Sequence, residues 1–242
     1  MLTRLLLFHL AVVAGLRTTK NVAQRAATAL QRGEVFVQPC WLSDVQPVRV
    51  AASTQLQQRG WAASVGGEKQ VNEGLRNCVM LDMLTDATWP TLPPVLQQLA
   101  AAVDELRAEL AQATGRPLLE SAELQLLCYP PGGHYHRHVD VRTSTQHLPV
   151  RRSISILIFL TSQDWAPADG GQLRAYTPHA HDVESSPGTL VLFDSATTPH
   201  EVLPTRRERH VCVGWLLEPA SPSPLPPGPA LALVPSTVDH DV

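Results

Sequence analysis

The first half of the chain carries apolar residues at helical spacing. Residues 21–32 place alanine, valine and leucine on one side of a helix, and Gly33 is suited to end it. Residues 43–58 predict a second helix, residues 90–113 a third and longest one, and residues 34–38 a short strand between the first two helices. The third helix repeats Leu92, Val95, Leu96, Leu99, Val103, Leu106 and Leu110. We therefore expect a helical N-terminal layer.

After Gly115 the pattern changes to short apolar runs bounded by turn residues. Strands are expected at 124–129, 135–139, 153–160, 171–176, 188–193 and 210–217. Turn clusters rich in proline and glycine separate them, at 130–133 and 167–171. Helices followed by many short strands favour an α+β, mainly β fold, in which the N-terminal helices pack on one sheet of a double-stranded β-helix, or jelly roll.

Segments near the two ends differ from this pattern. Residues 5–16 form an apolar run of 12 residues behind Arg4, which suits a signal-peptide core and is too short to span a bilayer. A first buried helix is the alternative interpretation. The residues from 219 to 235 are dominated by proline, which predicts a flexible tail. The chain thus divides into a signal or N-terminal helix at 1–20, one domain at 21–218 with its core at about 124–217, and a tail at 219–242.

Composition excludes some classes of function. The 242 residues are 44% hydrophobic and 17% charged, which is ordinary for a globular protein, and the net charge of −3 argues against a general nucleic-acid binder. No segment is expected to span a membrane. The four cysteines are scattered without a C-x-x-C pair, so we expect buried, reduced thiols rather than a structural zinc site. The sequence indicates no oligomeric state and leaves the compartment open between the secretory pathway and the cytoplasm.

The strand-rich half also concentrates side chains that can bind a metal. His138 and Asp140 are separated by one residue, so in a strand both leave the same face. With His200 they would supply two imidazoles and one carboxylate, a set typical of non-haem Fe(II) oxygenases because it leaves coordination positions open. His134 and His136 share the parity of His138 and are alternative ligands or contacts at the mouth of the site.

The arrangement around these residues resembles a known family. Residues 124–217 are similar to the iron- and 2-oxoglutarate-dependent dioxygenases of the prolyl 4-hydroxylase family. The pattern Y-x-x-G-x-x-Y-x-x-H-x-D is met by Tyr129, Gly132, Tyr135, His138 and Asp140. The later segments Gly170-Gly171-Gln172-Leu173-Arg174 and Pro199-His200-Glu201-Val202 more resemble the oxygen-sensing prolyl hydroxylases.

The resemblance implies a role for each site residue. His138, Asp140 and His200 would hold Fe(II), and the Arg209 guanidinium would bind the far carboxylate of 2-oxoglutarate bidentately. Tyr129 would contact or line the co-substrate site, and L-ascorbate would serve as reductant. Surface pairing of Arg209 with Glu201 or Glu208 remains the alternative.

One position departs from the family pattern. Where the oxygen-sensing enzymes have a tyrosine that assists the arginine, this chain has Phe159. The lost hydrogen bond would cost roughly 1 kcal/mol of co-substrate affinity unless Thr161 or Tyr176 replaces it.

The resemblance implies hydroxylation of prolyl residues in a peptide or protein, with release of succinate and CO2. The substrate would be recognised by the loops at 57–76 and 141–150. Arg137 and Arg152 are either further substrate contacts or ordinary solvated charges. Two alternatives stay open: the same chemistry on a small molecule or another side chain, and a jelly-roll metal-binding protein without catalysis.

Overall fold

The structure is a computed structural model that describes residues 19–63, 71–141 and 149–220. The N-terminal apolar run and the tail from 221 onward lie outside the described residues, as do most of the loop at 141–150 and residues 64–70 of the loop at 57–76. In the part that is described, no helix is long and apolar enough to cross a membrane.

Three helices form where the apolar spacing predicted them. They are α1 (Thr19–Gln31), α2 (Gln46–Arg59) and α3 (Pro94–Thr114), with a 3-10 turn, η1 (Trp89–Thr91), before α3. The third helix starts four residues later than predicted because Pro93 and Pro94 place proline at its first turn, where the missing N–H costs no hydrogen bond. It ends at Gly115, whose φ of 69° is left-handed.

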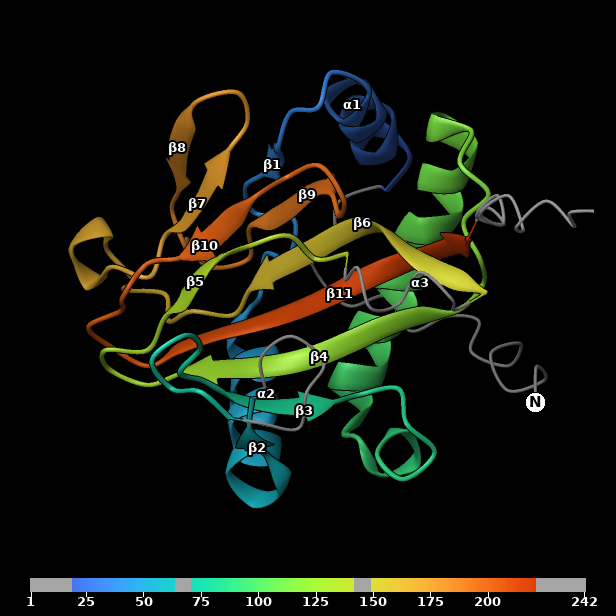
Figure 1. The fold of residues 1–242 in the computed structure, drawn as a ribbon. Coiled ribbons are helices and arrows are strands. Elements are labelled where there is room, and N and C mark those ends of the chain that lie inside the picture. The colour runs from blue at the N-terminus through green and yellow to red at the C-terminus, as the bar shows by residue number, and fades with distance from the viewer. Residues whose placement is uncertain (1–18, 64–70, 142–148, 221–242) are drawn as a thin grey trace, which may run out of the picture.

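Within the described residues the strands form two antiparallel sheets (Figure 1). The seven-stranded sheet has the spatial order β1 (Phe36–Gln38), β9 (Leu190–Asp194), β6 (Val150–Phe159), β11 (Arg209–Pro219), β4 (Ala122–Tyr129), β3 (Val79–Asp82) and β2 (Trp61–Ala62). The four-stranded sheet has the order β5 (Tyr135–His138), β10 (His200–Val202), β7 (Leu173–Tyr176) and β8 (Ala180–Val183). A further 3-10 turn, η3 (Pro167–Asp169), precedes β7. The predicted jelly roll with helices on one sheet is thereby confirmed.

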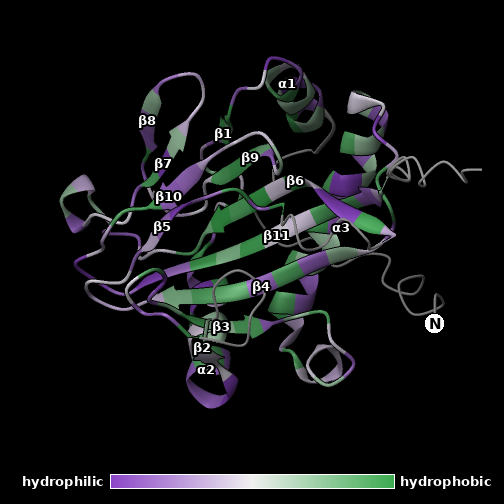
Figure 2. Ribbon diagram, viewed as in Figure 1, coloured by the Kyte–Doolittle hydropathy of each residue, from purple (hydrophilic) through white to green (hydrophobic). Residues whose placement is uncertain are grey.

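Two apolar clusters separate the layers, and the long strand β11 contributes to both. Cys212 and Leu216 face the helices, whereas Val211, Val213 and Trp215 face the small sheet. This alternation follows from the two-residue period of a strand whose two faces are both covered. Figure 2 shows the consequence as largely hydrophobic central strands in the large sheet. The space between the two sheets is where the polar site residues meet.

Some expectations from the sequence are wrong. The segment 57–76, expected to be a loop, begins with the last turn of α2 and with β2, which pairs with β3. Burial was expected for all four thiols, but only Cys78 and Cys212 are buried, whereas Cys40 is exposed and Cys128 is half-buried. Burial was inferred from residue type alone, and a connecting segment such as the one holding Cys40 leaves side chains in solvent.

Gly188 allows a close approach between two backbone segments. It has φ +72°, and a Cβ built on it would lie 1.9 Å from the carbonyl oxygen of Leu42. We expect Gly188→Ala to lower the free energy of unfolding by about 1–2 kcal/mol, because alanine is strained at a left-handed φ. The backbone shift that the added Cβ forces should lower it by about 1–3 kcal/mol more.

Gly115→Ala is the matched control for this prediction. Gly115 has a similar φ of +69° but no atom within 4 Å of the built Cβ, so only the strain applies. Urea unfolding of both variants measures the two free-energy losses, and equal losses would contradict the collision with Leu42.

Candidate metal and co-substrate site

The predicted H-x-D pair and the later histidine meet at the edge where β5 pairs with β10. His138 ends β5, Asp140 follows it, and His200 is the cross-strand partner of His138. The Nε2 atom of His138 lies 3.5 Å from one carboxylate oxygen of Asp140, and the Nε2 atom of His200 lies 3.8 Å from the other. The three potential ligand atoms lie within 4.8 Å of one another. These distances suit three ligands on one face of a metal ion.

Backbone carbonyls orient both imidazole rings. The Nδ1 atom of His138 lies 2.8 Å from the carbonyl oxygen of His136, and that of His200 lies 3.0 Å from the carbonyl oxygen of Thr198. A proton on each Nδ1 would donate to the carbonyl and leave Nε2 as an electron-pair donor. Burial lowers the pKa of His200 despite the nearby carboxylate. The ring is therefore neutral near neutral pH, the form that binds a metal.

Asp140 is held in its ionised form. Burial by itself raises the pKa of this carboxyl, but His200, His138 and a 2.6 Å hydrogen bond donated by the Ser155 hydroxyl outweigh burial and hold the pKa below its usual range. The Ser155 hydroxyl also shares a hydrogen bond of 2.8 Å with Ser195. Both serines fix the carboxylate, and no feature of the sequence pattern indicated either of them.

Arg209 is completely buried, at the start of β11. Its Nε donates a 2.9 Å hydrogen bond to the Ser185 hydroxyl, but Nη1 and Nη2 have no hydrogen-bond partner among the described residues. Burial lowers its pKa to about 10. A guanidinium with two buried, unpartnered nitrogens suits a carboxylate ligand, whose two oxygens would accept one hydrogen bond from each nitrogen.

The surface pairing considered for Arg209 does not form in the described residues. Glu201 accepts a hydrogen bond from the Tyr176 hydroxyl instead, and Glu208 is exposed. The ring centroids of Tyr129 and Phe159 lie 5.2 and 5.0 Å from the guanidinium carbon. Apolar and aromatic walls thus surround a cation that is left available to a ligand.

Neither candidate replacement for the missing tyrosine hydroxyl at Phe159 contacts Arg209. Thr161 donates to the backbone carbonyl of Ser185, and Tyr176 is engaged with Glu201. The polar group beside Arg209 is the Ser185 hydroxyl, which lies in the connection between β8 and β9. Sequence spacing could not identify it because the contact joins segments 24 residues apart.

A cavity of about 260 Å³ lies between the sheets next to the triad. Tyr129 and Tyr135 line it together with the three potential metal ligands, and Tyr135 stacks on the ring of His138 at a centroid distance of 3.7 Å. Tyr129 is the cross-strand neighbour of Arg209, which itself lies beyond the cavity lining. A ligand that contacts both the triad and Arg209 must therefore extend from the cavity past Tyr129.

Two arginines lie at the cavity with aromatic partners. The Arg152 guanidinium lies 3.5 Å from the ring of Trp215 and forms an ion pair with Glu123, while that of Arg137 lies 3.9 Å from the ring of Tyr176. Both arginines line the cavity. Each is therefore placed to contact a ligand there.

Comparisons with known proteins agree with this geometry. Residues 124–217 match the 2OG-Fe(II) oxygenase superfamily. A PKHD-type hydroxylase of Synechococcus sp. (strain JA-2-3B'a(2-13)) is 30% identical over 109 residues, which cover 44% of this chain and 47% of that protein. The match thus spans about half the length of this curated relative.

Two solved structures resemble the whole described fold. A prolyl-4-hydroxylase of Pseudomonas putida is 30% identical with a TM-score of 0.69, covering 81% of this chain and 98% of that chain. A Trichoplax adhaerens prolyl hydroxylase, solved with a peptide fragment of the hypoxia inducible factor oxygen degradation domain, has a TM-score of 0.72 at 20% identity. That likeness covers 83% of this chain and 90% of that chain and supports the fold. The chain belongs to the 2OG-Fe(II) oxygenase superfamily and, within it, to the prolyl 4-hydroxylase family of 2-oxoglutarate-dependent dioxygenases.

Proposed function

We propose that this protein is a dioxygenase that uses Fe(II), O2 and 2-oxoglutarate to hydroxylate prolyl residues in a peptide or protein, releasing succinate and CO2. The observation that carries the proposal is Arg209, whose two terminal nitrogens are buried without partners among the described residues. A protein that only bound a metal would have no use for a buried cation beside the metal site, because such a cation costs stability when nothing neutralises it.

His138, Asp140 and His200 would hold the iron. Their ligand set of two neutral imidazoles and one carboxylate suits Fe(II) and leaves positions for co-substrate and O2. When bound, the ion with 2-oxoglutarate supplies the oxidising chemistry, and the protein supplies orientation and a site shielded from water. L-Ascorbate is the reductant that we propose to keep the iron in its Fe(II) form.

The protein's own residues then position the co-substrate. The Arg209 guanidinium would donate to both oxygens of the far carboxylate, while the Ser185 hydroxyl fixes Nε and so the plane of the guanidinium. Gly171 permits this placement, because a Cβ there would lie 2.6 Å from Cδ of Arg209. Tyr129 lines the cavity beside the triad and is the cross-strand partner of Arg209, and we propose that its side chain contacts the bound co-substrate.

A prolyl peptide is the substrate that the relatives favour. The Pseudomonas putida structure is named a prolyl-4-hydroxylase, and the Trichoplax adhaerens enzyme was solved with a peptide fragment. Arg137 and Arg152 line the cavity and are proposed contacts for that peptide, with the loops at 57–76 and 141–150. The catalytic domain is proposed to occupy residues 21–218, with its core at about 124–217.

The test is to load the purified chain with Fe(II) without oxygen, add O2 and 2-oxoglutarate, and measure succinate with and without proline-containing peptides. We expect a peptide to stimulate succinate formation and to gain one oxygen atom on proline, read by mass spectrometry. Turnover that no peptide stimulates would retain the oxygenase and discard the prolyl substrate. Failure to turn over with iron bound would favour a binding protein.

A further inference from the structure

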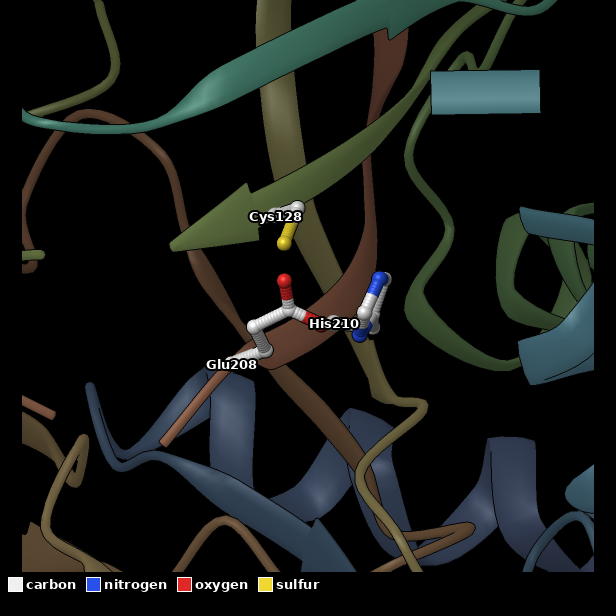
Figure 3. Close-up of side chains that lie close together, drawn as sticks. All are labelled: Cys128, Glu208 and His210. Atoms are coloured by element: carbon white, nitrogen blue, oxygen red, sulfur yellow. The ribbon is translucent and has the colours of Figure 1, made fainter. Parts of the chain in front are cut away.

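A second group of side chains of the types that bind metals lies on the face of the large sheet that packs against the helices. Cys128 of β4 is the cross-strand partner of His210 of β11, and Glu208 lies just before that strand. One potential ligand atom from each lies within 4.8 Å of the others. Figure 3 shows the Cys128 sulfur and the Glu208 carboxylate pointing toward each other, with the imidazole of His210 beside them.

The cluster is separate from the oxygenase site. Side chains alternate along a strand, so Cys128 and His210 leave the sheet on the face opposite to their neighbours Tyr129 and Arg209. None of the three residues of the cluster lines the cavity beside the triad. They lie on the side of the sheet where α2 packs on β4 and β11. A ligand there would not compete directly with 2-oxoglutarate.

The donor atoms of this cluster determine which ion suits it. A thiolate, an imidazole and a carboxylate are all common ligands of Zn²⁺, whereas Mg²⁺ and Ca²⁺ prefer oxygen alone. Glu208 is exposed, so water can reach a fourth tetrahedral position. We propose that Cys128, Glu208 and His210 form a second metal site, which binds a borderline divalent cation of the zinc type.

His210 gives this proposal an independent support. Its side chain is 2% exposed, and its Nδ1 atom has no hydrogen-bond partner among the described residues. A polar atom buried at this depth without a partner destabilises the folded protein. Binding an ion through the imidazole would bring the ring a polar partner that the described residues do not supply.

The charges around the cluster are consistent with a cation. An ionised Cys128 and Glu208 carry two negative charges, which balance one divalent ion. The positive charge of Arg49 on α2 acts to lower the pKa of both Cys128 and His210, and the same charge would repel a bound cation. The site should therefore bind more weakly than a closed structural zinc site.

Binding displaces a proton from the thiol. Burial, with Glu208 nearby, raises the pKa of Cys128 to about 12, so the thiol is protonated in the free protein. The S–H bond breaks, the proton leaves to solvent, and a sulfur–metal bond forms, so no oxidant or reductant is needed. Because Glu208 and His210 flank Arg209 in the chain, the bound ion would also fix the start of the strand that carries Arg209.

Cobalt(II) tests the proposal, because a thiolate bound to cobalt gives a charge-transfer absorption that a histidine and carboxylate site does not. The double variant His138→Ala/His200→Ala removes the triad as a competing site. Titrated with Co²⁺ without oxygen, it should develop this band at about one equivalent per chain and lose it when Zn²⁺ is added, since zinc binds such sites more tightly. The measurement does not depend on oxygenase activity, so its failure is distinguishable from failure of the proposed function.

Two cysteine variants on that background provide the controls. Cys128→Ser should abolish the band, whereas Cys40→Ser, which changes an exposed thiol, should leave it unchanged. Circular dichroism checks that each variant is folded. Absence of a thiolate band in the parent double variant, or its persistence in folded Cys128→Ser, would overturn the second site.

Discussion

Asp140→Ala is expected to reduce succinate formation by roughly a thousandfold or more. Loss of a residue that only orients a metal ligand typically costs about 10–100-fold, and Asp140 is itself a proposed ligand, so its loss should cost more. The substitution removes the carboxylate that lies within 3.5–3.8 Å of both imidazoles. Iron content after desalting and the initial rate of succinate formation measure the effect, and both should fall together.

Asp182→Ala is the matched control for this loss. Asp182 is an aspartate of β8 that forms a partly exposed ion pair with Arg174, remote from the triad in sequence. We expect this variant to keep its iron and its rate, because such pairs contribute little. An Asp140→Ala variant that folds, binds iron and turns over normally would refute the assignment of the triad.

Arg209→Met is expected to weaken 2-oxoglutarate binding by about 100- to 10,000-fold, since two charge-assisted hydrogen bonds contribute about 1.5–3 kcal/mol each. Methionine fills much of the volume without a charge. Isothermal titration measures the affinity in the presence of Fe(II) and without oxygen. In a thermal shift assay, 2-oxoglutarate should stabilise the wild-type protein and leave the variant unchanged.

Arg207→Met separates this effect from a general loss of positive charge. Arg207 lies two residues away, but its side chain is 41% exposed and pairs with Asp164 and Asp169. Its replacement should leave the 2-oxoglutarate affinity within about fivefold of wild type, because a surface pair contributes at most about 1 kcal/mol. If both variants lost affinity equally, Arg209 would not be the carboxylate partner.

Much of the fold follows from patterns that act locally. The apolar period of α3 and the left-handed glycine after it determine a helix without reference to the rest of the chain. The long strands β4, β6 and β11 were equally visible, because central strands are apolar on both faces. Sequence reasoning missed the strands β2, β3, β8 and β10, which have two to four residues. It found the equally short β1, β5 and β7, so strand length alone did not decide which strands could be predicted.

The candidate triad could also be proposed from the chain. His138 and Asp140 share a strand face through a spacing of two residues, which needs no tertiary information. His200 and Arg209 were selected by the spacing of the family that the sequence resembles. That the two histidines are cross-strand partners required the pairing of β5 with β10, whereas each Nδ1 atom lies at a carbonyl only two residues earlier in its own segment.

The sequence by itself therefore determined the helices, the long strands and the pairing of His138 with Asp140 on one strand face, because these depend on spacing along one element. Only the tertiary structure placed Ser185 against Arg209, Ser155 against Asp140 and Cys128 beside His210. Each of these contacts joins segments far apart in the chain. They arise from the choice of strand partners and from layer packing, and the hydrophobic period within one element does not say which other element it will meet.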